Sequence, residues 1–144
     1  MKIIDLQPNH QPILQQVALL LVEGFKEYWP EAWPDEAAAL TEVQDSFGEE
    51  RISRIAIGRS GAVLGWIGGI RQYDGHVWEL HPLVVSPAHQ RRGIGRALVA
   101  DLEEQVKARG GLTLWLGSDD QANMTSLGGI DLYPDVLQHL LNIQ

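Results

Sequence analysis

The residues best suited to chemistry lie in one continuous stretch, from Trp78 to Val99. Glu79 and His81 are two residues apart in an apolar run, and side chains at that spacing point to one face of a sheet. A carboxylate and an imidazole on one face are suited to accepting a proton or holding a cation. Each also has a purely structural interpretation, as a solvated charge on a sheet face (Glu79) and as a hydrogen-bonded structural histidine (His81).

A basic glycine loop follows this run, at residues 90–95, after a predicted turn at Ser86-Pro87 and before a predicted helix. A strand that delivers such a loop to a helix N-terminus presents backbone N–H groups and the positive end of the helix dipole to an anion. The loop lacks the ending of a P-loop and the third glycine of the dinucleotide fingerprint. The structural alternative is an ordinary surface turn with solvated arginines. The candidate anion-binding residues are Gln90, Arg91, Arg92, Gly93, Ile94, Gly95, Arg96 and Ala97.

The composition indicates one acidic globular domain, spanning residues 1–144. The formal net charge of −8 argues against a nucleic-acid partner and suits a cationic ligand, although many proteins are acidic for solubility alone. The chain has no cysteine, which excludes disulfides and thiolate nucleophiles, and we expect no metal. No apolar run is long enough to span a membrane and no signal-peptide pattern opens the chain, so we expect a cytoplasmic protein.

The N-terminal third predicts one strand and two helices. Residues 1–6 are typical of an edge strand, and helical spacing of apolar residues predicts an amphipathic helix from Pro12 to about Tyr28. Two prolines make the aromatic, acidic segment 28–35 a loop. Asp35 is a candidate N-cap for a second helix that runs to about Ser46.

The remainder predicts a mixed sheet in an α/β (α+β) fold. Strands at 52–58, 62–71 and 77–85 follow one another through short turns, which indicates an antiparallel meander. Glycines 65, 68 and 69 indicate a bulge or a close backbone approach in the second of these strands. A helix at 95–109 and a strand at 112–117 complete a βαβ unit, so the sheet becomes parallel there. Residues 121–129 are loop-like, and 131–142 are typical of a short helix.

The periodicity of the 95–109 helix divides its residues into two faces. The apolar face is expected to carry Ile94, Leu98, Leu102, Gln105 and Val106. The polar face is expected to carry Asp101, Glu103, Glu104 and Lys107.

The segment Gln-Arg-Arg-Gly-Ile-Gly-Arg-Ala (90–97) resembles the acyl-CoA pyrophosphate loop of the GNAT superfamily of N-acetyltransferases. The segments 29–31, 78–85, 109–111, 116–120, 131–133 and 142–144 resemble one branch of it, the aminoglycoside 6′-N-acetyltransferases of chromosomal, enterococcal type. The likeness spans most of the chain and is strongest from Trp78 to Asp120. It implies a GNAT-like sheet with helices on both faces.

The resemblance implies direct transfer of an acetyl group from acetyl-CoA to a primary amine of an aminosugar in a ternary complex. It also implies a β-bulge that opens a gap for the pantetheine arm, which would pair with the backbone of Leu83, Val84 and Val85. The N–H near Leu83 would then polarise the thioester carbonyl. Glu79 matches the acidic residue near the attacking amine, and we assign His81 to positioning.

The acceptor site is expected to be an acidic cleft, because an aminoglycoside carries several ammonium groups. Asp119 matches an acid of the family's substrate site, and Asp120 and the loop around Trp29 complete the predicted cleft. Trp29 or Trp33 would pack on sugar faces. The alternatives are a polar turn or helix cap for the aspartates and core packing for the tryptophans.

The family pattern continues beyond residue 144 with a tyrosine-bearing helix and further strands. Tyr28, Tyr73 and Tyr133 do not match that tyrosine, which serves the family as a general acid. We therefore expect a C-terminally truncated member whose exposed sheet edge is covered in a homodimer or higher homo-oligomer. Two other functions remain open: acetylation of another small amine or peptide, and CoA binding without turnover.

Overall fold

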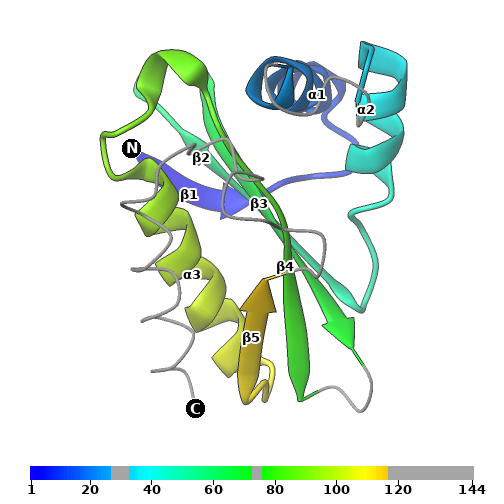
Figure 1. Cartoon of the computed structure of the whole chain (residues 1–144), viewed down its shortest axis with the longest axis vertical. Coiled ribbons are helices and arrows are strands. Elements are labelled where there is room, and N and C mark those ends of the chain that lie inside the picture. The colour runs from blue at the N-terminus through cyan, green and yellow to red at the C-terminus, as the bar shows by residue number, and fades with distance from the viewer. Residues whose placement is uncertain (27–32, 73–75, 117–144) are drawn as a thin grey trace.

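The computed structural model describes residues 1–26, 33–72 and 76–116, and its nine elements form one mixed sheet with helices on both faces (Figure 1). The strands are β1 (Lys2–Asp5), β2 (Arg51–Ile57), β3 (Val63–Gln72), β4 (Val77–Val85) and β5 (Thr113–Leu116). The helices are α1 (Gln11–Phe25), α2 (Glu36–Gln44), the short 3-10 helix η1 (Pro87–His89) and α3 (Ile94–Ala108).

The sheet has the predicted topology. Its strand order is β1-β2-β3-β4-β5; the first four strands are antiparallel, and β5 pairs with β4 in parallel. β1 is an edge strand, and the crossover through α3 gives the βαβ unit. The mixed α/β fold expected from the sequence is therefore confirmed.

Two apolar cores lie on opposite faces of this sheet. α3 contributes Leu98 and Leu102 to one core, with Trp78 and Leu80 of β4. α1 and α2 cover the other face, where Trp66 is fully buried. Figure 1 shows the same division, with α1 and α2 on one side of the strands and α3 on the other.

The element ends differ from prediction by a few residues. α1 begins at Gln11, one residue before the predicted start, and ends at Phe25 rather than near Tyr28. Asp35 caps α2 as predicted: its side chain accepts a 2.9 Å hydrogen bond from the backbone N–H of Ala38. The predicted helix at 131–142 and loop at 121–129 lie outside the described residues.

The predicted polar face of α3 is wrong at two positions. Glu103 is buried, with 7% of its surface exposed, because it lies on the same side of the helix as Val99 and Val106. Asp101 faces β2, where its carboxylate accepts two hydrogen bonds from Arg54, at 2.8 and 3.0 Å.

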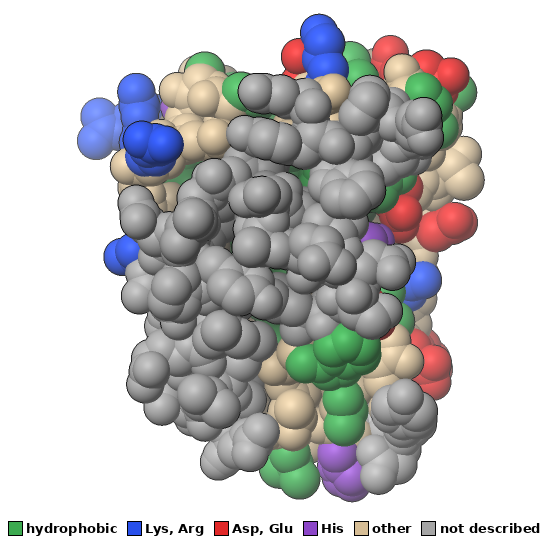
Figure 2. Space-filling view, viewed as in Figure 1, with side chains coloured by type: hydrophobic (Ala, Val, Ile, Leu, Met, Phe, Trp, Pro, Cys, Tyr) green, Lys and Arg blue, Asp and Glu red, His purple; other side chains and the backbone are tan. Residues whose placement is uncertain are grey.

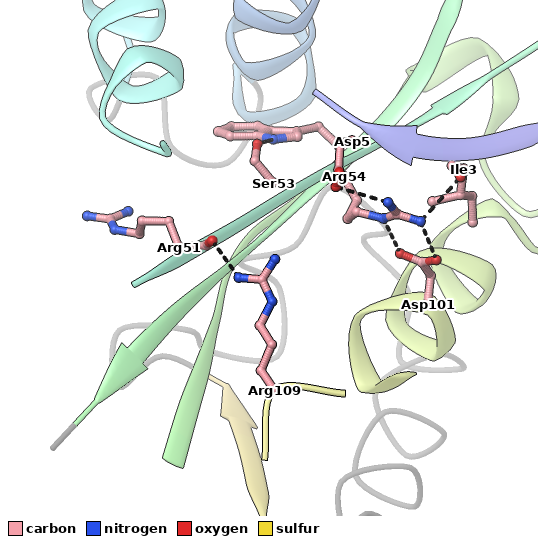
Figure 3. A network of polar contacts seen from close by, with 8 residues as sticks. Ile3, Asp5, Arg51, Ser53, Arg54, Asp101 and Arg109 are labelled. Atoms are coloured by element: carbon pink, nitrogen blue, oxygen red, sulfur yellow. Dashed lines mark hydrogen bonds and ion pairs between the residues drawn. The ribbon is translucent and has the colours of Figure 1, made fainter. Parts of the chain in front are cut away.

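Arg54 ties three elements together (Figure 3). Besides Asp101 on α3, its guanidinium donates to the Asp5 carboxylate at 3.0 Å and to the carbonyl oxygen of Ile3 at 3.3 Å, both on β1. The hydrogen bond to Asp101 is the main cause that raises the pKa of Arg54 above its ordinary value, against the opposing effect of burial. The network fixes the edge strand β1 and the helix α3 to β2.

None of the helices within the described residues has the length and apolar character needed to cross a membrane.

Candidate functional site

The site is organised by β4, which carries Glu79 and His81 and then delivers the glycine loop. Burial alternates along its first half: Trp78 and Leu80 are buried against α3, whereas Glu79 and His81 are half-buried. Alternation therefore places the carboxylate and the imidazole together on the α1/α2 face, as predicted.

A β-bulge interrupts this alternation at His81 and Pro82. Gly69 pairs with Leu80 and Ile67 pairs with Leu83, so three steps on β4 oppose two on β3. The extra residue reverses the faces, and Leu83 joins Leu80 in the α3 core instead of following His81. The bulge that the family resemblance implies is thus present in β4.

Gly68 makes room for this bulge. A Cβ atom at Gly68 would lie 2.5 Å from the carbonyl oxygen of His81, a backbone atom that moves aside only if β4 itself shifts. Gly65 and Gly69 have a different role, because Cβ atoms there would lie 2.9 and 3.0 Å from leucine side chains of α3. The predicted close backbone approach is confirmed at Gly68, whereas the bulge lies in the neighbouring strand β4 and not in β3, where it was predicted.

The described pairing of β5 with β4 ends where the bulge begins. β5 pairs with Val77 to Leu80, and its last described residue is Leu116. Leu83, Val84 and Val85 pair with β3 on their other side. Within the described part of β5, Leu83 therefore lies just beyond the point where β4 stops pairing with its parallel neighbour.

The glycine loop ends at a helix start that has no side-chain cap. Gly93 is the N-cap of α3 with φ +83°, and this N-cap makes no side-chain hydrogen bond. A Cβ at Gly93 would meet nothing within 4 Å, so the requirement for glycine is one of backbone conformation. Arg91 also has a positive φ, of 68°. The first N–H groups of a helix, at the positive end of its dipole, suit an anion.

The loop is basic and exposed. Arg91, Arg92 and Arg96 are exposed, whereas Ile94 and Gly95 are buried. Figure 2 shows basic side chains gathered over the connection between β4 and α3, and acidic side chains on the opposite side, near α1 and α2. Gln90 folds back, and its amide donates to the carbonyl oxygen of Val85 at 3.4 Å.

Glu79 and His81 each contact a neighbouring side chain. Glu79 Oε1 accepts a 2.8 Å hydrogen bond from the Nε2 amide of Gln72, a residue that the sequence analysis did not single out. The His81 ring lies 6.4 Å, centroid to centroid, from Trp33, which packs edge-on against Phe25 at 4.9 Å. Trp33 therefore belongs to the edge of the core and also borders His81.

Several predicted acceptor residues lie outside the described part of the chain: Trp29, Asp119 and Asp120, together with Tyr28, Tyr73 and Tyr133. Their roles stay predictions. Within the described ranges, no group of three or more potential ligand residues could hold a metal ion.

The position of the carboxylate relative to the loop limits the ligand's shape. Glu79 and Val85 are separated by roughly 17–20 Å of strand, from the rise per residue and the bulge. A ligand that touches both the helix start and the carboxylate region must be long, with its anionic group at the α3 end. The loop residues and the bulge fit the diphosphate and the narrow arm of coenzyme A.

Comparison with known proteins decides the family. Residues 18–133 match the model of the acetyltransferase (GNAT) family. The chain belongs to the GNAT acetyltransferase family. Acetyl-CoA is the acetyl donor that GNAT enzymes use, so the fit of the loop to a diphosphate agrees with the family.

Solved structures support the same assignment to the GNAT family. An aminoglycoside 6′-acetyltransferase type Ii is 36% identical with a TM-score of 0.71, over 84% of this chain and 74% of that one. An aminoglycoside 6′-N-acetyltransferase complexed with coenzyme A is 36% identical (TM-score 0.71), over 81% of this chain. The enzyme from Enterococcus faecium is 35% identical (TM-score 0.69), also over 81%. The chain spans 61% of the length of these last two structures. No curated protein matches the chain.

Proposed function

We propose that this GNAT protein transfers the acetyl group of acetyl-CoA to a primary amine of an aminoglycoside. One observation supports the proposal: β4, its bulge and the start of α3 place a carboxylate, a β-bulge and a basic, glycine-capped helix start along one continuous segment. The choice of an aminoglycoside as acceptor is supported by relatives of that activity at 35–36% identity.

The loop binds the diphosphate. Backbone N–H groups at the start of α3 donate hydrogen bonds to the diphosphate oxygens, and Arg91 and Arg92 neutralise part of the diphosphate charge. The pantetheine arm then runs along Leu83 to Val85, which brings the thioester to the bulge. The N–H near Leu83 polarises the thioester carbonyl, an electrostatic contribution that is large in acyl transfer.

Glu79 prepares the acceptor. An amine is protonated at neutral pH, and the carboxylate takes the proton directly or through one water. The nitrogen lone pair then attacks the carbonyl carbon: a C–N bond forms, the C–S bond breaks, and the sulfur leaves with the bonding pair. The nitrogen loses its second proton to solvent, and solvent protonates the departing thiolate. His81, held beside Trp33, borders the acceptor and positions it.

The acidic character of the chain fits this acceptor. The formal charge of −8 attracts a polycation, whereas the basic loop offers the cosubstrate a local site of opposite sign. Asp119, Asp120 and Trp29 complete the proposed acceptor site.

A thiol-release assay tests the proposal. The protein is mixed with acetyl-CoA and, separately, kanamycin, spermidine or a short peptide. We expect turnover with kanamycin. Turnover with spermidine or the peptide alone would move the acceptor to another amine class, and CoA binding without any turnover would contradict an enzymatic role.

A further inference from the structure

We propose that Gln72 is a positioning residue that holds the carboxylate of Glu79 for catalysis. The inference rests on the proposed function and deepens it. It begins from a contact between the last residue of β3 and the middle of β4: Gln72 Nε2 donates to Glu79 Oε1 at 2.8 Å.

The register of the two strands explains the contact. Ile70 lies directly opposite Glu79, and Gln72 lies opposite Val77. Gln72 and Glu79 are therefore diagonal neighbours on one face, about 7–8 Å apart at Cα, which only long side chains bridge. A glutamine reaches across this diagonal, and an asparagine is one methylene shorter.

The partner is neutral, which preserves the charge of the carboxylate. Within residues 1–26, 33–72 and 76–116, Gln72 is the only group that hydrogen-bonds Glu79, and no cation pairs with it. The neighbouring Arg71 lies opposite Trp78, and its guanidinium stands over that indole, 5.7 Å from the ring centroid. Alternation thus turns the arginine to the α3 face and the amide to the Glu79 face.

An amide at this position fixes one carboxylate oxygen without neutralising it. Oε1 is held, and Oε2 remains to receive the proton of the acceptor amine. A lysine or arginine in place of Gln72 would compete with the cationic acceptor for the same charge, whereas an apolar residue would leave the carboxylate free to rotate. Both side chains are half-buried, so holding them in place costs little conformational entropy. The hydrogen bond therefore serves to orient the carboxylate.

A double-mutant cycle tests the inference. Gln72→Met keeps the length of the side chain and removes the donor. We expect kcat to fall about tenfold, the size of one lost hydrogen bond to a charged group. The Kd for CoA should not change. In a Glu79→Gln background the same change should cost less than twofold. Gln44→Met, at the exposed end of α2, is the matched control and should leave kcat unchanged.

The outcomes separate this inference from the proposed function. Equal losses from Gln72→Met in both backgrounds, or no loss in the wild type, would overturn the role of Gln72 while Glu79→Gln still lowers kcat. An unchanged kcat in Glu79→Gln would remove the role of both residues. If the wild type acetylates no amine, the proposed function fails. A crystal structure of Gln72→Met then decides the positioning role, because a Glu79 carboxylate still in its original place overturns it.

Discussion

Two half-buried carboxylates in this protein have opposite surroundings. Asp101 accepts two hydrogen bonds from the Arg54 guanidinium, so its charge is compensated within the fold. Glu79 accepts one hydrogen bond from the neutral amide of Gln72. The first arrangement joins elements, and the second holds a carboxylate without a cationic partner among the described residues. Residue type alone does not separate these two roles, because the partners lie 47 and 7 positions away in the sequence.

The carboxylate of Glu79 is expected to matter for turnover more than for cosubstrate binding. Glu79→Gln keeps the shape and removes the base, so kcat should fall about 100-fold, within the usual range for a general base. The Kd for CoA, measured by calorimetry, should stay the same. His81→Asn should lower kcat less, since the proposed role of His81 is only to position the acceptor. An unchanged kcat in Glu79→Gln would contradict a catalytic role for Glu79.

The guanidinium of Arg54 is expected to stabilise the fold. Arg54→Leu leaves the carboxylate of Asp101, 17% exposed, without its partner, and should lower the free energy of unfolding by about 1.5–3 kcal/mol. Urea denaturation measures this change. Asp5→Ala is the matched control: the Asp5 side chain is 60% exposed, and its loss should cost less than about 1 kcal/mol. A larger loss for Asp5→Ala than for Arg54→Leu would contradict this account of the network.

At the level of elements, the sequence predicts the positions of the strands well, but it predicts less well which face of the sheet each side chain points to. The meander, the crossover helix and the Asp35 cap follow from turn residues, periodicity and a capping side chain, and all are confirmed. Strict alternation would put Leu83 on the face of His81, yet the bulge moves it to the other core. The sequence of β4 alone does not locate the extra residue, because the room for the bulge is provided by Gly68 on the neighbouring strand β3.

The bulge is expected to depend on Gly68. In Gly68→Ala the new Cβ would press on the carbonyl oxygen of His81, so the backbone of β4 must shift; overpacking of this kind costs about 1–3 kcal/mol. The thermal midpoint should fall and the Kd for CoA should rise. Gly58→Ala is the control, because its Cβ would meet only the flexible side chain of Leu64 at 3.3 Å. Equal stability of the two variants would show that β4 tolerates the contact.

For the molecule as a whole, the sheet separates two chemical regions. α3 lies on one side of the sheet and α1 and α2 lie on the other (Figure 1), and alternation along β4 turns Glu79 and His81 to the side of α1 and α2. The glycine loop and the carboxylate strand could be predicted from sequence because each occupies a few consecutive residues. Gln72 could not, because its role depends on strand register across a turn.

The homo-oligomer expected from the sequence stays a prediction at this scale. β1 forms one edge of the described sheet, and its Ile4 is 40% exposed. An exposed edge with apolar side chains favours pairing with another chain. Light scattering of the full chain should give at least the mass of a dimer, and a monomer would contradict the expectation.

The most direct test of the account is a calorimetric titration of CoA into the wild type, Arg92→Ala and Arg59→Ala. Arg92 and Arg59 are both exposed, but only Arg92 lies in the loop before α3. We predict that the wild type binds CoA and that Arg92→Ala binds it about tenfold more weakly, as expected for one charged contact. Arg59→Ala should bind like the wild type. No binding by the wild type, or one Kd for all three proteins, would contradict the assignment of the glycine loop to the diphosphate.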